Sequence, residues 1–271
     1  MKKIAHISDL HFGTEDPTVA AGLLRDLEEF QPDLTAVSGD LTQRARHSEF
    51  TAARDYLSKI AAPKIIVPGN HDIPLYNVLH RWLAPLKNYQ EIIIRDMHPL
   101  FHDDEIAVAG VNTARSNTWK EGRVSHSQIT RLQAQFQSLP RHLAKVLVSH
   151  HPFIPPEHDP EAAVVGRVRE TLKMLAGVGC GLILSGHLHR VASSDTRPYH
   201  VEIARSILVF QAGTAISQRR RGEPNAYNRI QISGERLELD VRSWEGMNFR
   251  SASKKSYQHS ETGWSEVGKC E

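Results

Sequence analysis

Five short apolar runs in this chain each end in a cluster of Asp, Asn or His, and this repeat constrains the fold more than any other feature. The third run is the most informative, because the β-branched residues 65–67 lead through Pro68 into Gly69-Asn70-His71-Asp72. A short apolar run that ends at Gly or Pro is typical of a buried strand followed by a turn. The other four clusters are Asp9 with His11 after residues 3–7, Gly39-Asp40 after 34–38, His150-His151 after 145–149, and Gly186-His187-Leu188-His189 after 182–185.

These clusters predict a metal site at one rim of a sheet. An open α/β sheet has its ligand crevice at the carboxyl ends of its strands, so five such strands would bring their polar groups together there. Carboxylate oxygen, amide oxygen and imidazole nitrogen suit Mn, Fe, Zn or Co better than Ca or a thiol-loving ion. Seven ligands are too many for one ion with an open position, whereas two ions about 3.5–4 Å apart that share a carboxylate account for them. The seven are Asp9, His11, Asp40, Asn70, His150, His187 and His189.

The alternation of strand and helix patterns predicts the fold class. Apolar residues recur at helical spacing over residues 17–30, 48–60, 74–86, 125–137 and 161–175. Strands without a long helix between them are expected at 92–94 and 106–111, and only strands beyond Arg190, at 199–203, 207–211, 226–232 and 237–244. This order predicts a four-layer α/β/β/α sandwich, in which two packed mixed sheets are flanked by helices. We assign residues 1–245 to a catalytic domain and the polar, aperiodic residues 246–271 to a C-terminal tail.

The bulk properties fit an ordinary globular protein. A chain of 271 residues fits one large domain, and a formal net charge of +2 is too small to favour nucleic acid or a membrane surface. The first residues are interrupted by His6, Ser8 and Asp9, unlike a signal peptide, and no apolar run has the length of a membrane span, so we expect a cytoplasmic protein. Two cysteines form no disulfide framework, and Cys180, within an apolar run, is expected to be an unreactive core thiol. A monomer and a homodimer are both compatible with these properties.

The five clusters occur in an order that resembles the calcineurin-like metallophosphoesterase superfamily, over residues 1 to about 215. The segments His150-His151-Pro152 and Ala114-Arg115-Ser116 are similar to those of its bacterial class III cyclic-nucleotide phosphodiesterases and glycerophosphodiesterases. The resemblance implies one metal held by Asp9, His11, Asp40 and His189, and a second held by Asp40, Asn70, His150 and His187. It favours His150 over His151 as the ligand, and leaves His151 as a packing or supporting residue.

The resemblance also implies a reaction and the residues that assist it. His71 would face the phosphate, where it would stabilise charge or protonate the leaving oxygen, and Asp72 would orient His71 by hydrogen bonding. A water bridging two divalent ions would be deprotonated near neutral pH and attack phosphorus in line. We therefore expect a phosphodiesterase that acts on a small phosphodiester, either a cyclic nucleotide or a glycerophosphodiester.

Two other functions are compatible with the same residues. A pyrophosphatase acting on a nucleotide-linked lipid would need an exposed apolar lid, which residues 73–86 could supply, although Trp82 and Leu83 are expected to pack inward. A non-catalytic metal-binding scaffold would be favoured by loss of Asn70 or His71, and both are present.

A run of three arginines is the main candidate for substrate binding. Arg219, Arg220 and Arg221 could line the mouth of the site and bind a phosphate bidentately, or they could belong to a solvated hairpin loop.

Overall fold

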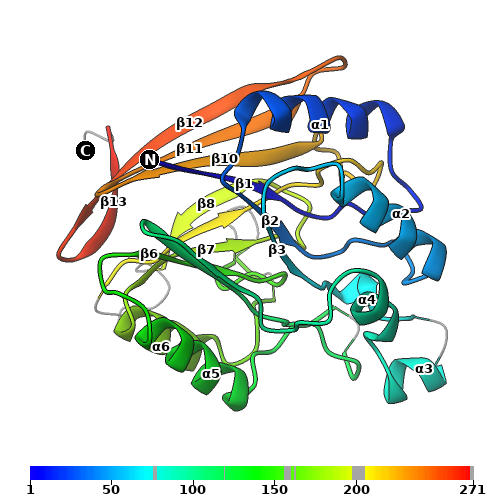
Figure 1. Ribbon diagram of the computed structural model, residues 1–271, viewed down its shortest axis with the longest axis horizontal. Coiled ribbons are helices and arrows are strands. Elements are labelled where there is room, and N and C mark those ends of the chain that lie inside the picture. Colours follow the sequence, from blue (N-terminus) through cyan, green and yellow to red (C-terminus); the bar gives the residue numbers. More distant parts are fainter. Residues whose placement is uncertain (76–77, 119, 156–159, 162, 197–204, 269–271) are drawn as a thin grey trace.

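The computed structural model describes residues 1–75, 78–118, 120–155, 160–161, 163–196 and 205–268, and places two sheets face to face (Figure 1). The first has the order β13 (Gly263–Val267), β12 (Phe249–Ser260), β11 (Arg236–Trp244), β10 (Ala226–Ser233), β1 (Lys2–Ile7), β2 (Leu34–Ser38) and β3 (Lys64–Val67). The second has the order β4 (Leu100–His102), β5 (Ile106–Gly110), β6 (Ala144–Val148), β7 (Cys180–Ser185), β9 (Leu208–Gln211) and β8 (Ala192–Asp195). Both sheets contain parallel and antiparallel neighbours.

Successive side chains of the strands serve different layers, because strand residues point alternately to the two faces of a sheet. In β1, Ile4 lies in the core between the two sheets, whereas Ala5 and Ile7 face the helices. From the second sheet, Val108 and Val146 complete the same central core. The strands are thus buried on both sides, which explains why they appear in the sequence as continuous apolar runs.

Helices cover the outer face of each sheet and complete the predicted four layers (Figure 1). The first sheet is covered by α1 (Pro17–Phe30), α2 (His47–Leu57) and the short α4 (Lys87–Ile92), and the second by α5 (His126–Gln137) and α6 (Val168–Gly177). A capping box begins α5, since Ser125 and Gln128 each bond the other's backbone N–H. The four-layer α/β/β/α prediction is confirmed. Within the described residues, no helix has both the length and the apolar character needed to cross a bilayer.

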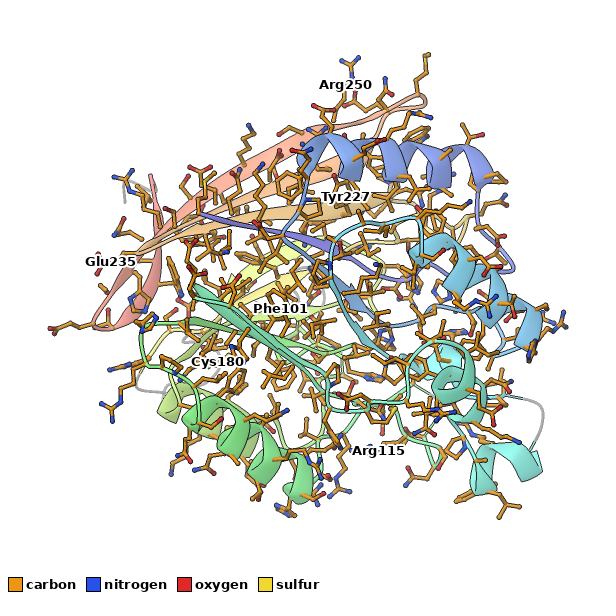
Figure 2. All side chains as sticks on the ribbon, in the orientation of Figure 1. Phe101, Arg115, Cys180, Tyr227, Glu235 and Arg250 are labelled. Carbon is orange, nitrogen blue, oxygen red and sulfur yellow. The ribbon has the colours of Figure 1, made fainter. Side chains whose placement is uncertain are left out.

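A buried charge cluster fixes α1 to the first sheet. Asp26 on α1 forms an ion pair with Arg229 of β10 (2.8 Å) and accepts hydrogen bonds from Nε and Nη2 of Arg242 of β11 (3.1 and 2.8 Å). The hydroxyl of Tyr227, labelled in Figure 2, donates to the same carboxylate. One carboxylate of the helix therefore ties together two neighbouring strands.

Three local expectations differ from the structure or lie outside it. Residues 92–94 were expected to form a strand, but α4 extends to Ile92 and all three isoleucines pack partly buried against the helices of the first sheet. Trp82 and Leu83 were expected to pack inward, but they are 62% and 76% exposed on α3 (Val78–Leu83). The strand expected at 199–203 lies outside the described residues.

The expectation of an irregular segment after Gly246 is wrong. Residues 249–260 and 263–267 form β12 and β13, which extend the first sheet by antiparallel pairing, with Trp244 opposite Phe249 and Arg236 opposite Gln258. Most of β12 is solvent-exposed and carries Ser, Lys and Arg, so it lacks an apolar run. Because these strands continue the sheet that contains β1, the domain boundary at residue 245 stays a prediction without a visible break in the fold.

Candidate metal centre

The structure brings all seven predicted ligands to the carboxyl ends of β1, β2, β3, β6 and β7, where they form two clusters. In the first, Oδ1 of Asp9 lies 3.6 Å from Nε2 of His11 and 3.7 Å from Nε2 of His189. Oδ2 of Asp40 lies 3.7 Å from the same nitrogen of His11. All four side chains are buried, so two carboxylates and two imidazoles converge away from the surface.

The second cluster is centred on Nε2 of His150. This nitrogen lies 3.1 Å from Oδ1 of Asn70, 3.2 Å from Nδ1 of His187 and 3.4 Å from Oδ1 of Asp40. Asp40 therefore presents one oxygen to each cluster.

The donor atoms fit a pair of transition-metal ions. Ligands of one such ion each lie about 2.0–2.2 Å from it, so neighbouring ligand atoms lie about 3–3.5 Å apart. Oδ1 of Asp9 and Nε2 of His11 are buried and have no hydrogen-bond partner among the described residues, which is costly for polar atoms unless a cation satisfies them. Together the two clusters are consistent with a dinuclear metal site.

Hydrogen bonds behind the rings direct two imidazole nitrogens toward the clusters. Nδ1 of His150 lies 2.8 Å from the carbonyl oxygen of Ser38, and because a carbonyl can only accept, Nδ1 carries the proton and Nε2 keeps its lone pair. Nδ1 of His189 lies 2.7 Å from the Thr214 hydroxyl, an arrangement that likewise leaves Nε2 of His189 facing Asp9. Such partners fix the tautomer of a metal-binding histidine.

The environment favours the protonation states that metal binding requires. Burial, helped by the neighbouring His150, lowers the pKa of His187 to about 3, and burial lowers the pKa of His189 to about 4. Both rings are therefore neutral at neutral pH, with a lone pair available. Burial opposes the charge of Asp9, but the nearby histidines hold the pKa of that carboxyl well below its ordinary value. His187 and His189 thus offer neutral imidazoles beside the ionised carboxylate of Asp9.

Five of the seven residues have left-handed backbone conformations. The φ angles are +52° for Asp9, +45° for His11, +50° for Asp40, +75° for His187 and +60° for His189. A residue other than glycine is uncommon in this region, and such conformations cost about 1–3 kcal/mol each where the surrounding structure imposes them. Their concentration at one rim indicates that the strand ends are bent to point these side chains at a common centre.

The glycines that directly precede Asn70 and His187 leave space for neighbouring side chains of the centre. A methyl group on Gly69 would lie 2.1 Å from Oδ1 of Asp40, and one on Gly186 would lie 1.9 Å from the Ser8 hydroxyl and 2.6 Å from Oδ2 of Asp9. That oxygen of Asp9 accepts hydrogen bonds from the Ser8 hydroxyl (2.6 Å) and the backbone N–H of His187 (3.0 Å). Close packing within the centre therefore requires glycine at both positions.

His71 lies beside the first cluster, and Asp72 has a different task from the one expected. The ring of His71 packs edge-on against the ring of His11 at 5.0 Å, and its backbone N–H donates to Asp40 (2.8 Å). Among the described residues, the Asp72 carboxylate accepts from the backbone N–H groups of Gly69, Leu41 and Thr42 and from the Thr42 hydroxyl, and not from the His71 ring. The predicted direct bond between the two is wrong, and Asp72 instead joins the turns after β2 and β3.

The three arginines are not equivalent. Arg219 is half-buried and its Nη1 lies 2.8 Å from Nε2 of His71, whereas Arg220 and Arg221 are exposed. Their role in substrate binding stays a prediction.

Two further residues lie beside the centre: His151, which was expected to have a packing or supporting role, and Thr214, which was not among the predicted site residues. The Nε2 atom of His151 is buried, has no hydrogen-bond partner in the part of the chain that the structure describes, and lies near His150 and His187. Its Nδ1 bonds the Thr113 hydroxyl at 2.8 Å. Thr214, which contacts His189, follows β9 in the short segment Gly213-Thr214. The only sequence signal for its role was its position shortly after the apolar run of this strand.

Comparison with known proteins agrees with this geometry. The family model for the calcineurin-like phosphoesterases matches residues 2–191. The chain belongs to this family. It is 26% identical over 233 residues to a glycerophosphodiester phosphodiesterase of Enterobacter lignolyticus, covering 73% of this chain and 82% of that protein. It is 32% identical over 80 residues to a probable cyclic nucleotide phosphodiesterase of a Synechococcus species, covering 26% of this chain and 31% of that protein.

Solved structures share the fold at low sequence identity. A dimetal phosphatase from Danio rerio superposes with a TM-score of 0.66 at 13% identity, over 93% of this chain and 99% of that chain. A purple acid phosphatase from yellow lupin seeds superposes with a TM-score of 0.69 at 12% identity, over 94% of this chain and 53% of that chain. At these identities the likeness establishes the metallophosphoesterase fold and nothing about the substrate.

Proposed function

We propose that this calcineurin-like phosphoesterase is a dinuclear-metal phosphodiesterase that hydrolyses a small phosphodiester. The observation that carries the proposal is the position of Asp40, whose two oxygens each face a separate cluster of buried ligands. One ion would be held by Asp9, His11, Asp40 and His189, and the other by Asp40, Asn70, His150 and His187. The chemistry that a bound pair of divalent ions supplies is activation of water near neutral pH and neutralisation of the phosphate oxygens.

The protein's own residues prepare the site for this reaction. Five of the seven ligands are buried from bulk water, which strengthens every electrostatic interaction with a bound phosphate. His71 stands beside the first cluster without joining it, so its ring is placed to contact a phosphate or leaving oxygen. No side chain is needed as a nucleophile in this scheme.

The substrate class is supported by the relative with the longer match. The glycerophosphodiester phosphodiesterase of Enterobacter lignolyticus aligns across most of both chains, whereas the cyclic nucleotide phosphodiesterase aligns over a short segment. We therefore place glycerophosphodiesters first and cyclic nucleotides second. The cytoplasmic location, the identity of the metals among Mn, Fe, Zn and Co, and the choice between monomer and homodimer stay predictions from the sequence.

The test compares an aryl phosphodiester with the matching monoester, using protein stripped of metal and reconstituted separately with Mn, Fe, Co and Zn. We expect metal-restored hydrolysis of the diester and little hydrolysis of the monoester. Preference for the monoester would make the protein a phosphatase. Two bound ions without activity toward either ester would contradict the proposal and favour the scaffold function.

One observation favours a second candidate, a pyrophosphatase acting on a nucleotide-linked lipid. Trp82 and Leu83 are exposed on α3, and the buried Arg81 ties this helix to the loop after β5 through the carbonyl of Ser116 (2.7 Å). An exposed apolar pair of this kind is what a lipid chain would contact. Hydrolysis of a nucleotide-linked lipid that falls when Trp82 and Leu83 are both replaced by Ser, while aryl diester hydrolysis is unchanged, would support this candidate.

A further inference from the structure

A basic pocket lies at the end of the second sheet that is opposite the metal centre. β6 and β7 both begin beside it, and both end at the rim that carries His150 and His187. Cys180, the first residue of β7, is labelled in Figure 2. The cavity measures about 730 Å³, and four of the described side chains that line it are cationic, whereas none is acidic. The four are Arg141, Lys145, Lys173 and Arg205.

Within the part of the chain that the structure describes, no carboxylate compensates these charges, because none of the four side chains forms an ion pair. Nζ of Lys145 donates to the carbonyl oxygen of Val178 (2.9 Å), directly after α6. An ammonium group has three N–H donors, so this bond leaves two of them for another acceptor. The pocket therefore offers more donors and more positive charge than its own residues use.

The ends of two helices supply only part of the missing negative charge. α5 ends at Gln137 and α6 ends at Gly177, and both residues line the pocket. The carboxyl end of a helix carries about half an elementary negative charge, so two ends supply about one charge against four cationic side chains. A concave site with this remaining positive charge attracts and concentrates anions.

Lys145 would gain most from a bound anion. It is 6% exposed, so its ammonium group meets solvent or a ligand chiefly through the pocket that it lines. Burial lowers the pKa of this ammonium group, and the positive charge of the nearby Arg141 lowers it further. A buried charge without an opposite charge is costly, and a phosphate in the pocket would provide that opposite charge.

We propose that this pocket binds a small organic phosphate with at least two negative charges, at a site separate from the metal centre. The planar guanidinium groups of Arg141 and Arg205 suit the oxygens of a phosphate. Pockets for small molecules measure about 300–1,000 Å³, so this cavity has room for an organic group besides the phosphate. Leu139, Ala176 and Val178 supply an apolar wall for that group. The proposal does not rest on the proposed function.

The first test measures binding of adenosine 5′-monophosphate to the metal-loaded protein by isothermal titration calorimetry. The variant Lys173→Ala/Arg205→Ala removes two exposed cations of the pocket, and the matched control Arg236→Ala/Lys254→Ala removes two exposed cations of β11 and β12. We expect the pocket variant to raise Kd at least about 10-fold while the control binds like the parent protein. Hydrolysis of an aryl phosphodiester should have the same kcat and KM in all three proteins.

The calorimetric outcomes separate the pocket from the metal centre. Binding of the nucleotide at the metal centre would give the same Kd in all three proteins, and this result alone would overturn the proposal. An equal loss in the pocket variant and the control would show an unspecific effect of net charge and would overturn it as well. Absence of diesterase activity together with the expected change in Kd would refute the proposed function alone.

The second test locates the bound anion by protection of lysines from acylation, followed by mass spectrometry. Lys173 and Lys254 are both exposed and should react in the free, metal-loaded protein. We expect saturating adenosine 5′-monophosphate to suppress labelling of Lys173 and to leave labelling of Lys254 unchanged. Adenosine, which lacks the phosphate, should protect neither lysine. Undiminished labelling of Lys173, or equal protection by adenosine, would overturn the proposal.

Discussion

Replacing Asp26 by Ala should destabilise the protein strongly, because it removes the carboxylate that holds two arginines against α1. Asp26 is 7% exposed, accepts two charge-assisted hydrogen bonds from Arg242 and one hydrogen bond from Tyr227, and forms an ion pair with Arg229. Removing one partner of a buried ion pair costs about 3–5 kcal/mol, mainly because the opposite charge stays buried without compensation.

The structure places the expected cost near the lower end of that range. The side chains of Arg229 and Arg242 are 12% and 14% exposed, so water can reach them in part. Each also keeps another acceptor, the Asp26 carbonyl for Arg229 (2.7 Å) and the Phe249 carbonyl for Arg242 (2.7 Å). We therefore expect a loss of about 3 kcal/mol in the free energy of unfolding, which lowers Tm by roughly 6 °C in a chain of this size.

Thermal unfolding followed by circular dichroism, at one fixed metal concentration, measures this loss. The matched control is Asp55→Ala, which removes an exposed carboxylate paired with Arg54 (2.7 Å) and should cost less than about 1 kcal/mol. If Asp26→Ala lowers Tm no more than Asp55→Ala does, the cluster does not anchor α1 and the reasoning is refuted.

Three further predictions concern the metal centre and the core. Asn70→Ala should reduce the metal content toward one ion per chain, measured by elemental analysis after gel filtration, and retention of both ions would remove Asn70 from the ligand set. Gly186→Ala should weaken metal binding at least about 10-fold, because its methyl group would collide with the Ser8 hydroxyl and Asp9, whereas Gly177→Ala, with open space around it, should not. In a Cys270→Ser variant, Cys180 should resist alkylation at pH 8 until the protein is denatured, since burial raises the pKa of its thiol to about 12; rapid labelling of the folded protein would contradict this.

The sequence predicts the secondary structure of a segment well only where burial imposes an apolar pattern on that segment. The strands that end in ligands are buried on both faces, so their apolar runs and the polar clusters after them are both visible. β12 is mostly exposed and owes its conformation to pairing with β11, so its Ser- and Lys-rich sequence gives no comparable signal. At Ile92 the β-branched run suggested a strand, but packing against the helices of the first sheet decided the local structure.

At the site, the sequence predicts which residues are ligands but not the contacts that surround them. The seven converging residues were found because they directly follow five strands that end at the same rim. The contacts of His71 with Arg219 and Gln43 were not, because they join segments that are 148 and 28 residues apart. Asp72 illustrates the limit most clearly, since its neighbour in the sequence is not its neighbour in the hydrogen-bond network.

The position of β1 has a consequence for the order in which the protein matures during synthesis. β1 leads directly to Asp9 and His11, yet in the sheet it lies between β2 and β10, with Lys2 opposite Ile232. During synthesis β1 therefore emerges long before β10, and its second edge stays unpaired until β10 has been made. A nascent chain that stops before residue 226 would hold the beginnings of the metal centre on an open strand edge, a state prone to aggregation.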